Sequence, residues 1–494
     1  MKPQNWTLPA LDLAAISALV AGRAFSSDSR KLAPGDVFIA FKGEYSDGRD
    51  YIDNAIAAGA GAVIWEADDF SWKPEWSAVP NLAVPQLRAQ AGIIAAHLLG
   101  NPSQQLCVVG ITGTNGKTSI AHWLTQAFTL LGEKAAVLGT LGNGVWGNIS
   151  ESTHTTLDPL SVQNWLHQFA ADGVRNVAME VSSHGLAQAR AHGVVFDTAV
   201  FTNLTRDHLD YHADMAAYGA EKARLFQWEG LKTAVINVDD EFGRQLADQS
   251  SAAQVLTYGL NSGDIRALWV KTSLAGIELE IDTPFGRSRV HSKMIGAFNA
   301  YNLLAALGVL LGAGVALADA VRVLEQIEPA AGRMQRLGGD ALPLVIVDYA
   351  HTPDALQKAL STLRDSMDGG KLFCVFGCGG DRDPGKRPLM GRIACDLADN
   401  VLITSDNPRT EAPAAIVDQI IAGLGGVPGT GDDHYSVSID RRTAIGDAIA
   451  VAEAGDVVLI AGKGHEAYQE INGVRHHFDD VEEARAALER KQQA

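Results

Sequence analysis

The sequence predicts a three-domain α/β protein whose sheets are mainly parallel and covered by helices. Short, nearly continuous apolar runs alternate with helical segments in two separate series, as expected for strands that are buried on both faces. The length of 494 residues corresponds to roughly three domains of ~150 residues each. The 47% share of hydrophobic residues is sufficient for several cores.

The three domains follow one another along the chain, and we predict their bounds at residues 1–101, 102–335 and 336–494. The first has short strand signals at 36–41 and 61–66, and the polar cluster at 100–105 marks its end. In the second domain, strands are predicted at 106–112, 134–140, 176–183, 197–204 and 233–240. In the third, which we expect to be Rossmann-like, they are predicted at 344–350, 371–380, 400–408 and 456–464.

Composition and charge argue against several classes of protein. The formal net charge of −18 disfavours a nucleic-acid-binding protein, since phosphate backbones are bound by clusters of Lys and Arg. The four cysteines form no CxxC pair and are expected to be buried, reduced thiols. Asp12 interrupts the apolar N-terminal stretch, which we interpret as an amphipathic helix rather than a signal peptide. The apolar run at 303–321 is interpreted as a buried helix, so we expect a cytoplasmic protein without a membrane span.

A glycine-rich turn follows the first strand of the second domain, with the sequence GITGTNGKTS at 110–119. The strict phosphate-loop pattern requires glycine where this chain has Ile111. Gly113 and Gly116 still allow the backbone to approach phosphate oxygens. A tight strand–helix turn would explain the glycines but not the pair Lys117 and Thr118. We therefore predict a nucleoside-triphosphate site, with Lys117 at the β- and γ-phosphates and the Thr118 hydroxyl on Mg²⁺.

Acidic and histidine side chains follow later strands of the same domain. Glu180 ends one strand, and Asp207, His208 and Asp210 follow the next. Mg²⁺ takes carboxylate oxygens and few other protein ligands, so Glu180 and His208 could hold it against the triphosphate. Each residue alone is as readily a solvated loop residue or a cap. Lys222 alone is typical of an exposed helical lysine.

Charged loops that contain glycine lie at successive strand ends of the third domain. They contain Asp348 and His351, then Arg382, Asp383, Lys386 and Arg387, then Arg409, and finally Lys463, His465 and Glu466. Ligands of open α/β sheets bind at the carboxyl ends of the strands. We therefore interpret these loops as the wall of a second substrate site.

A series of motifs resembles, in order, those of the Mur ligase family, ATP-dependent amide-forming enzymes of peptidoglycan synthesis. They are GTNGKT (113–118), EVSSHGL (180–186), LTRDHLDYH (204–212), GAFNAYN (296–302), GRMQ (332–335), DYAHTPDAL (348–356) and GGDRDPGKRPLMG (379–391). The resemblance covers essentially the whole chain. It implies a UDP-binding first domain, a central ATP-binding domain and an amino-acid-binding third domain.

The resemblance also implies roles for matching residues. Its catalytic set is Lys117, Glu180, His208 and Lys222. Its metal ligands are Thr118, Glu180, His208 and Lys222, the last as a carbamate whose oxygen binds a second Mg²⁺. ATP contacts are implied for Gly113, Thr114, Asn115, Gly116, Lys117, Thr118, Asn299, Asn302, Arg333 and Asp348. Contacts to the UDP-muramoyl dipeptide are implied for Ser27, Ser29, Thr155, Thr156, Ser182, Gln188 and Arg190.

The acceptor amino acid is predicted from the motif DNPR at 406–409. The family's diaminopimelate-adding members carry this motif, and its lysine-adding members differ there. The far end of meso-diaminopimelate is a carboxylate that an Arg fork can bind with two hydrogen bonds, whereas a lysine ammonium would be repelled. The implied pocket contains Arg382, Asp406, Asn407, Pro408, Arg409, Gly462 and Glu466, with Glu466 paired to the distal ammonium.

These features predict a monomeric ligase that uses ATP and Mg²⁺ to add meso-diaminopimelate to UDP-N-acetylmuramoyl-L-alanyl-D-glutamate through an acyl phosphate. The base that deprotonates the amine is left open between His208 and His351. The alternatives are a lysine-adding ligase, a folylpolyglutamate synthetase-like enzyme, and a P-loop ATPase that acts as a switch or motor. The DNPR motif disfavours the lysine-adding ligase, and a UDP-sugar domain disfavours the folate-type enzyme. The negative charge disfavours the ATPase.

Overall fold

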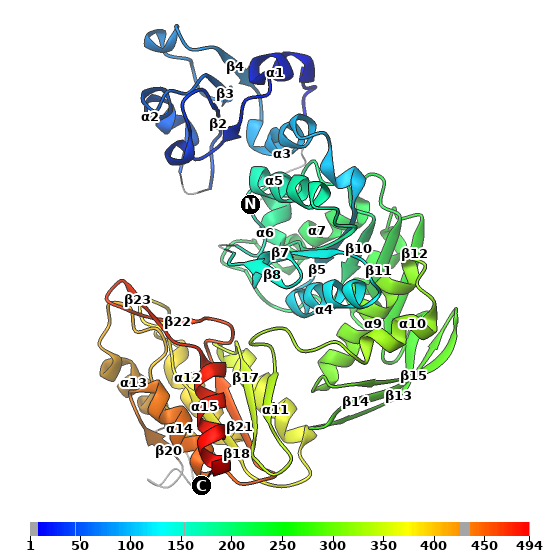
Figure 1. Ribbon diagram of the computed structural model, residues 1–494, viewed down its shortest axis with the longest axis vertical. Helices are drawn as coiled ribbons and strands as arrows, with labels where there is room; N and C mark the ends of the chain where they lie inside the picture. The colour runs from blue at the N-terminus through cyan, green and yellow to red at the C-terminus, as the bar shows by residue number, and fades with distance from the viewer. Residues whose placement is uncertain (1–7, 45, 153, 425–434, 494) are drawn as a thin grey trace. The chain divides into compact units, whose positions relative to one another are not determined.

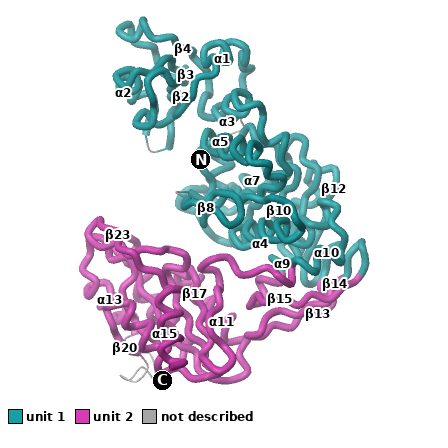
Figure 2. Tube along the Cα trace, viewed as in Figure 1, with its two compact units in different colours: residues 1–266, 282–286, 301–323 teal, residues 267–281, 287–300, 324–494 magenta. Residues whose placement is uncertain are grey.

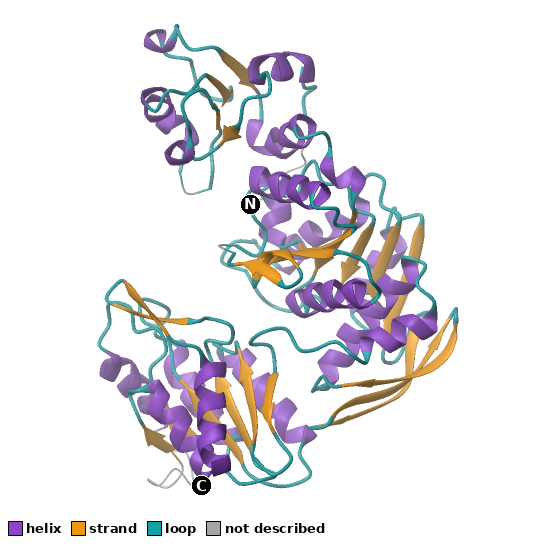
Figure 3. Cartoon of the chain, in the orientation of Figure 1, coloured by secondary structure: helices purple, strands orange, loops and turns teal. Residues whose placement is uncertain are grey.

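The computed structural model describes residues 8–44, 46–152, 154–424 and 435–493. The chain divides into two compact units (Figure 2): residues 1–266, 282–286 and 301–323 form the first, and residues 267–281, 287–300 and 324–494 form the second. Helices and strands alternate along most of the chain (Figure 3), as the apolar runs predict.

The N-terminal part of the first unit is a parallel sheet of order β1-β2-β3-β4 (Figure 1). Its elements are α1 (Leu13–Val20), β1 (Phe25–Ser26), β2 (Val37–Ala40), α2 (Ile52–Ala57), β3 (Ala62–Glu66), β4 (Asn81–Val84) and α3 (Leu87–Leu98). Ile39 and Ile64 pack in one cluster and Phe38 and Val63 in another, so both faces of β2 and β3 are buried. Asp12 caps α1 by accepting a hydrogen bond from the backbone of Ala15 at 2.9 Å, whereas residues 1–7 of the expected helix lie outside the described ranges.

The central sheet has the strand order β15-β14-β13-β12-β11-β10-β5-β9-β6-β7-β8, and most residues of β13, β14 and β15 belong to the second unit. The strands are β5 (Cys107–Thr112), β6 (Ala135–Gly139), β7 (Gly142–Val145), β8 (Asn148–Ser150), β9 (Asn176–Glu180), β10 (Thr198–Phe201), β11 (Thr233–Asn237), β12 (Gln254–Gly259), β13 (Ile265–Ser273), β14 (Gly276–Thr283) and β15 (Gly286–Ser292). The helices are α4 (Lys117–Leu130), α5 (Pro159–Ala171), α6 (Ser183–Ala187), α7 (Met215–Ala223), α8 (Glu241–Gln249), α9 (Ala297–Gly312) and α10 (Leu317–Leu324). β5 runs parallel to both β9 and β10, so the loops that follow these strands leave the same edge.

The second unit contains a sheet of order β16-β17-β21-β18-β19-β20, in which β16 is antiparallel to its neighbour. The strands are β16 (Gln335–Gly338), β17 (Leu344–Asp348), β18 (Leu372–Phe376), β19 (Asn400–Ile403), β20 (Tyr435–Val437), β21 (Val457–Ala461) and the hairpin strands β22 (Tyr468–Ile471) and β23 (Val474–His477). The helices are α11 (Pro353–Ser366), α12 (Lys386–Leu397), α13 (Pro413–Ile421), α14 (Arg441–Val451) and α15 (Asp480–Gln493). Alternate strand residues pack against α11–α13 on one face and against α14 and α15 on the other.

The most apolar stretch of the sequence forms α9 and the start of α10. Leu303, Leu307 and Leu310 of α9 are each at most 1% exposed, so its apolar character is explained by packing. Over the described ranges, no helix has the length and apolar character needed to cross a membrane. Cys374 and Cys378 are buried, whereas Cys107 and Cys395 are partly exposed, and all four are free thiols.

Candidate functional site

The predicted phosphate loop lies between β5 and α4 and is fastened to the segment that follows β10. The backbone N–H of Thr114 donates to the Asn203 carbonyl at 2.8 Å, and Thr202 Oγ1 donates to the Asn115 carbonyl at 2.6 Å. A Cβ atom at Gly113 would lie only 1.8 Å from Thr202 Oγ1. The close approach of two loops therefore requires glycine here, whatever residue stands at position 111.

Two lysine side chains meet at the carbonyl oxygen of Gly113. Lys117 Nζ donates to it at 2.9 Å and to the Thr114 carbonyl at 2.9 Å. Lys222 Nζ donates to the same Gly113 oxygen at 3.0 Å. These contacts place two potential cations at the opening of the loop.

Lys222 is not the exposed helical lysine that its sequence context alone would indicate, since it is 1% exposed. Burial, assisted by the nearby charge of Lys117, lowers the pKa of Lys222 well below its usual value, and Asp207 opposes this shift. This shift raises the share of the neutral amine, and only a neutral amine can add to CO₂ to form a carbamate.

The Glu180 carboxylate ends β9 and is fully buried. It accepts hydrogen bonds from Thr118 Oγ1 at 2.9 Å and from the Thr140 backbone N–H and hydroxyl at 2.8 and 3.1 Å. Thr140 Oγ1 also lies 3.0 Å from Thr155 Oγ1, from which it can accept a hydrogen bond. Thr140, which ends the predicted strand at 134–140, thus belongs to the same cluster, and its place at a strand end was the signal that could have identified it.

His208 lies in the loop after β10, with a side chain that is 43% exposed. Its ring centroid is 4.8 Å from that of His184 and 6.0 Å from that of Tyr218. Burial lowers the pKa of His208, and Lys117 also contributes to this shift, while Asp207 opposes it. The neutral imidazole, which is the metal-binding form, is therefore favoured.

The donors at this edge of the sheet fit Mg²⁺ better than a cation that requires a dense ligand cluster. Within the described ranges, three or more His, Cys, Asp or Glu side chains gather nowhere into a metal site. The buried Glu180 carboxylate instead has hydroxyl and amide partners and lies beside the Thr118 hydroxyl. Mg²⁺ keeps several waters and takes few carboxylate ligands, so a site with one carboxylate and one hydroxyl suits it.

The residues predicted to contact the dipeptide lie next to Glu180. Thr156 Oγ1 donates to the Glu180 carbonyl at 2.9 Å and lies 3.1 Å from Ser182 Oγ. Arg190 donates to Gln188 Oε1 at 2.6 and 3.0 Å and to the Thr156 carbonyl at 2.7 Å. The structure therefore joins this group to the phosphate-loop side chains through the end of β9.

The remaining predicted residues of this group and of the ATP site lie elsewhere. Ser27 and Ser29 follow β1 in the N-terminal sheet. Asn302 contacts the phosphate loop closely, since a Cβ at Gly116 would lie 2.5 Å from Asn302 Oδ1. Asn299, Arg333 and Asp348 belong to the second unit. There the Asn299 amide donates to the Ile295 carbonyl at 2.9 Å, the Arg333 guanidinium lies over the Tyr349 ring at 5.1 Å, and Asp348 accepts from the Met334 backbone at 2.8 Å.

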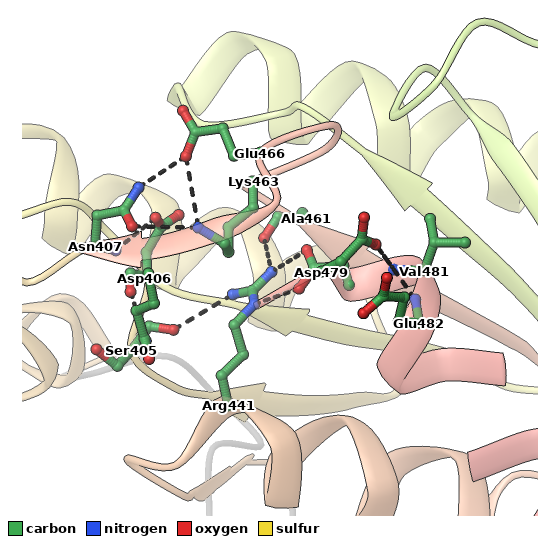
Figure 4. Close-up of polar contacts among 12 residues, drawn as sticks. Ser405, Asp406, Asn407, Arg441, Ala461, Lys463, Glu466, Asp479, Val481 and Glu482 are labelled. Carbon is green, nitrogen blue, oxygen red and sulfur yellow. Dashed lines mark hydrogen bonds and ion pairs between the residues drawn. The ribbon is translucent and has the colours of Figure 1, made fainter. Parts of the chain in front are cut away.

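In the second unit, the DNPR turn after β19 contacts the loop after β21 (Figure 4). Asn407 Nδ2 donates to Glu466 Oε2 at 2.7 Å. The neighbouring Lys463 Nζ donates to Asn407 Oδ1 at 3.2 Å and lies 3.5 Å from Glu466 Oε2. Gly462 adopts φ +118°, and a Cβ there would lie 2.6 Å from Asp406 Oδ2, so these two loops require glycine at their closest approach.

Arg409 joins this turn to the β22–β23 hairpin and to the glycine-rich loop after β18. Its backbone N–H donates to the Glu470 carbonyl at 3.0 Å, and its carbonyl accepts from the Asn472 N–H at 2.7 Å. Its Nη1 donates to the Gly380 carbonyl at 2.7 Å, and its Nε is 3.8 Å from Glu470 Oε2. Gly380 also packs on Pro408, whose carbonyl oxygen would be 1.9 Å from a Cβ at position 380.

Arg382 stands apart from these contacts. It is exposed on the same glycine-rich loop, where its Nη1 donates to the Asp381 carbonyl at 3.3 Å. The structure therefore brings Asp406, Asn407, Pro408, Arg409, Gly462 and Glu466 together, and places Arg382 at the surface of the same loop cluster.

A buried ion pair that the sequence did not predict joins Asp480 to Arg441, which Figure 4 shows beside Ser405 and Ala461. Arg441 donates to both carboxylate oxygens of Asp480 at 2.7 Å, and both side chains are 0% exposed. Arg441 also donates to the Ser405 carbonyl at 3.5 Å and to the Ala461 carbonyl at 3.1 Å. This pair therefore connects the ends of β19 and β21, and no sequence motif marks two residues that far apart as partners.

Comparison with known proteins identifies the same three-part organisation. Models of the Mur ligase family catalytic domain, the Mur ligase middle domain and the Mur ligase glutamate ligase domain match residues 24–97, 111–310 and 332–464. The chain is 56% identical over 493 residues to a UDP-N-acetylmuramoyl-L-alanyl-D-glutamate–2,6-diaminopimelate ligase of Chromobacterium violaceum, with 99% of each chain covered. It is 51% identical to the protein of the same name from Pseudomonas aeruginosa, over 94% of this chain and 95% of the relative.

Solved structures agree with this fold. A structure of a UDP-N-acetylmuramoyl-L-alanyl-D-glutamate–2,6-diaminopimelate ligase superposes with a TM-score of 0.72 at 41% identity, and 95% of each chain is covered. A MurF ligase from Thermotoga maritima, in complex with ADP, shares the fold at 21% identity, with a TM-score of 0.63 over 98% of this chain and all of that one. Because the family models and near-full-length relatives agree, this chain belongs to the Mur ligase family.

Proposed function

We propose that this protein is the ATP-dependent ligase that adds meso-diaminopimelate to UDP-N-acetylmuramoyl-L-alanyl-D-glutamate in peptidoglycan precursor synthesis. The observation that carries the proposal is the 56% identity, over 99% of the chain, to a relative named for this reaction. The cluster of Arg409, Asn407 and Glu466 supports it, because it offers a guanidinium, an amide and a carboxylate to a ligand with both charges at its far end.

The reaction must first make a carboxylate into an acyl donor. The D-glutamate carboxylate attacks the γ-phosphorus of ATP, ADP leaves, and an acyl phosphate forms; Mg²⁺ supplies charge neutralisation at the phosphoryl oxygens. The backbone of the Gly113–Gly116 loop holds the phosphates, and Lys117 leaves its carbonyl partners to bind them. Thr118, Glu180 and His208 would hold the metal, and Lys222, as a carbamate, would hold a second Mg²⁺; the hydrogen bond from Thr118 to Glu180 supports the first of these sites.

The second step forms the amide bond. The neutral amine of diaminopimelate attacks the acyl carbon, the C–O bond to phosphate breaks, and inorganic phosphate leaves. Arg409 binds the distal carboxylate, and Glu466 binds the distal ammonium, while Asn407 completes the pocket. Arg382 extends this pocket at its surface. Thr155, Thr156, Ser182, Gln188 and Arg190 hold the dipeptide, and Ser27 and Ser29 hold the uridine end. The enzyme acts as a cytoplasmic monomer.

A phosphate-release assay with purified protein tests the proposal. We expect turnover that requires ATP, Mg²⁺, UDP-N-acetylmuramoyl-L-alanyl-D-glutamate and meso-diaminopimelate together, and little turnover when lysine replaces diaminopimelate. Turnover with lysine but not diaminopimelate would contradict the assignment of the acceptor. Phosphate release that needs no amino acid would contradict the ligase reaction itself.

A further inference from the structure

Lys463 is a completely buried lysine at the proposed amino-acid site, and the proposed mechanism does not use it. Burial lowers the pKa of Lys463, and the carboxylates of Asp406 and Glu466 oppose this shift and favour the ammonium form. Lys463 follows β21, and its side chain is 0% exposed. Its ammonium group donates to Asn407 Oδ1 and to the Tyr468 carbonyl and lies 3.5 Å from Glu466 Oε2 (Figure 4). A buried ammonium is costly unless it has such partners, so its presence here calls for an explanation.

These contacts fix the orientation of the Asn407 amide. Asn407 Oδ1 accepts from Lys463 Nζ and also from the Glu470 backbone N–H at 2.9 Å. Both groups are donors only, so a flipped amide would turn its NH₂ toward two other donors. The amide NH₂ therefore faces Glu466 Oε2, to which it donates at 2.7 Å. The Lys463 ammonium therefore determines that the NH₂ end of the Asn407 amide, rather than its oxygen, faces Glu466.

The same ammonium determines the charge of the site. Burial raises the pKa of Glu466, Asp406 contributes to that rise, and Lys463 opposes it. Beneath the site, Arg441 and Asp480 neutralise each other. The formal charges of Asp406, Glu466 and Lys463 then leave one negative charge, which suits a ligand ammonium. Loss of Lys463 would remove the cation that opposes the raised pKa of Glu466 and would leave the carboxylates of Asp406 and Glu466 without it.

We propose that Lys463 is a positioning residue for the acceptor amino acid: through its own contact and through the Asn407 amide, it holds the Glu466 carboxylate in the position that binds the distal ammonium. The inference rests on the proposed function, because it assigns how the diaminopimelate pocket recognises one end of its substrate. Lys463 itself touches no substrate. Its action is indirect, through the two side chains that it contacts.

The test compares Lys463→Met and Lys463→Gln with the wild-type enzyme in the phosphate-release assay. Lys358→Met is the matched control, since Lys358 forms an exposed ion pair with Asp354 on α11. We expect the KM for diaminopimelate to rise about 30-fold in both Lys463 variants, in line with a lost hydrogen-bond network to a charged group. The kcat at saturation and the KM values for ATP and the nucleotide dipeptide should stay within about threefold of wild type.

A second ligand separates positioning from a general structural role. The inhibition constant of 2-aminopimelate, which lacks the distal amino group, is measured against diaminopimelate. If Lys463 acts through Glu466, its loss weakens the binding of diaminopimelate but changes the inhibition constant of 2-aminopimelate little. The inference is overturned if the binding of both ligands weakens equally or if the diaminopimelate kinetics do not change. If Lys463→Met does not fold, Lys463→Gln, which keeps a donor for the Tyr468 carbonyl, carries the comparison. Failure of the wild type to use diaminopimelate would instead refute the proposed function.

Discussion

Thr118 Oγ1 donates a hydrogen bond to Glu180 Oε2 at 2.9 Å, which joins the first turn of α4 to the end of β9. The Thr118 hydroxyl belongs to the phosphate loop and the carboxylate to the neighbouring strand, so a single cation can reach both. Glu180 is a buried carboxylate, and this contact is one of the hydrogen bonds from hydroxyls and a backbone amide that satisfy it.

Glu180→Gln is expected to lower kcat at least about 100-fold and to shift the Mg²⁺ requirement to higher concentration, because an amide replaces the anionic ligand. The shape of the side chain is kept, so the unfolding temperature should change little. The rate is measured against Mg²⁺ concentration at saturating ATP. A variant with wild-type rate and Mg²⁺ dependence would show that Glu180 is not a metal ligand.

Gly116→Ala and Gly132→Ala form a matched pair that isolates the phosphate loop. The two glycines flank α4 with nearly equal φ values, +89° and +87°, so an alanine costs similar backbone strain, about 1–2 kcal/mol, at each. Only at Gly116 would the new Cβ meet another atom, Asn302 Oδ1 at 2.5 Å. Calorimetric titration should show ATP binding lost in Gly116→Ala and kept in Gly132→Ala. Equal effects would indicate that strain alone matters.

Lys222 should form a carbamate at neutral pH, because burial lowers its pKa well below the usual value and so raises the share of neutral amine that can react with CO₂. Enzyme incubated with ¹³C-bicarbonate is expected to give a carbamate carbon resonance by NMR, and Lys222→Met should not. Lys117 provides the control, because Lys117→Met keeps Lys222 and so keeps the resonance. The absence of the signal in wild-type protein would contradict this prediction.

Arg409→Asn is expected to raise the KM for diaminopimelate about 100-fold, as the bidentate partner of a carboxylate is lost. Asparagine is the suitable replacement, since position 409 has φ +51°, a conformation that Asn tolerates better than alanine. The KM for ATP should be unchanged. Arg392→Asn, at an exposed ion pair on α12, controls for loss of a charge. Unchanged diaminopimelate kinetics would contradict the argument that the charge of Arg409 binds the distal carboxylate of the acceptor.

His465 gives the protein a predictable loss of stability in acid. Burial, together with Arg333 and Lys463, lowers the pKa of His465 to about 4 from its ordinary value of 6.5. Between these values the unfolded chain binds the proton and the folded chain does not, so the free energy of unfolding falls as pH falls from 6.5 to 4. Between pH 7 and pH 5, the free energy of unfolding of His465→Gln should fall by about 1 kcal/mol less than that of the wild type. Thermal unfolding at both pH values measures this, and equal losses would contradict it.

The alternating strands of both larger sheets could be predicted because they are buried on two faces, which makes them apolar without interruption; these strands are β5, β6, β9, β10, β11, β17, β18, β19 and β21. In β17, for example, Ile346 packs toward α11–α13 and Val347 toward α14 and α15. The place of the predicted phosphate loop between β5 and α4, and the edge of the sheet to which Glu180 belongs, could be predicted for a related reason, since parallel strands end at a common edge. The domain bounds and the ligand roles of individual residues remain predictions.

Other features could not be predicted, because they depend on contacts between distant segments. Nothing near Lys222 in the sequence indicates that it reaches the Gly113 carbonyl, 109 residues away. The burial of Lys463 against Asn407 and the pairing of Arg441 with Asp480 depend equally on packing. The left-handed backbone at Arg409 follows from its hydrogen bonds to the β22–β23 hairpin rather than from local preference.

The bonding of the DNPR turn to that hairpin has a consequence for how acceptor choice is inherited. Asn407 Oδ1 and the Glu470 N–H are partners across 63 positions, and the Arg409 backbone pairs with the same strand. A recombination event or an engineered graft that exchanges only one of these segments would separate Arg409 from the hairpin whose hydrogen bonds orient it. A new acceptor preference in this lineage therefore requires both segments to be replaced together.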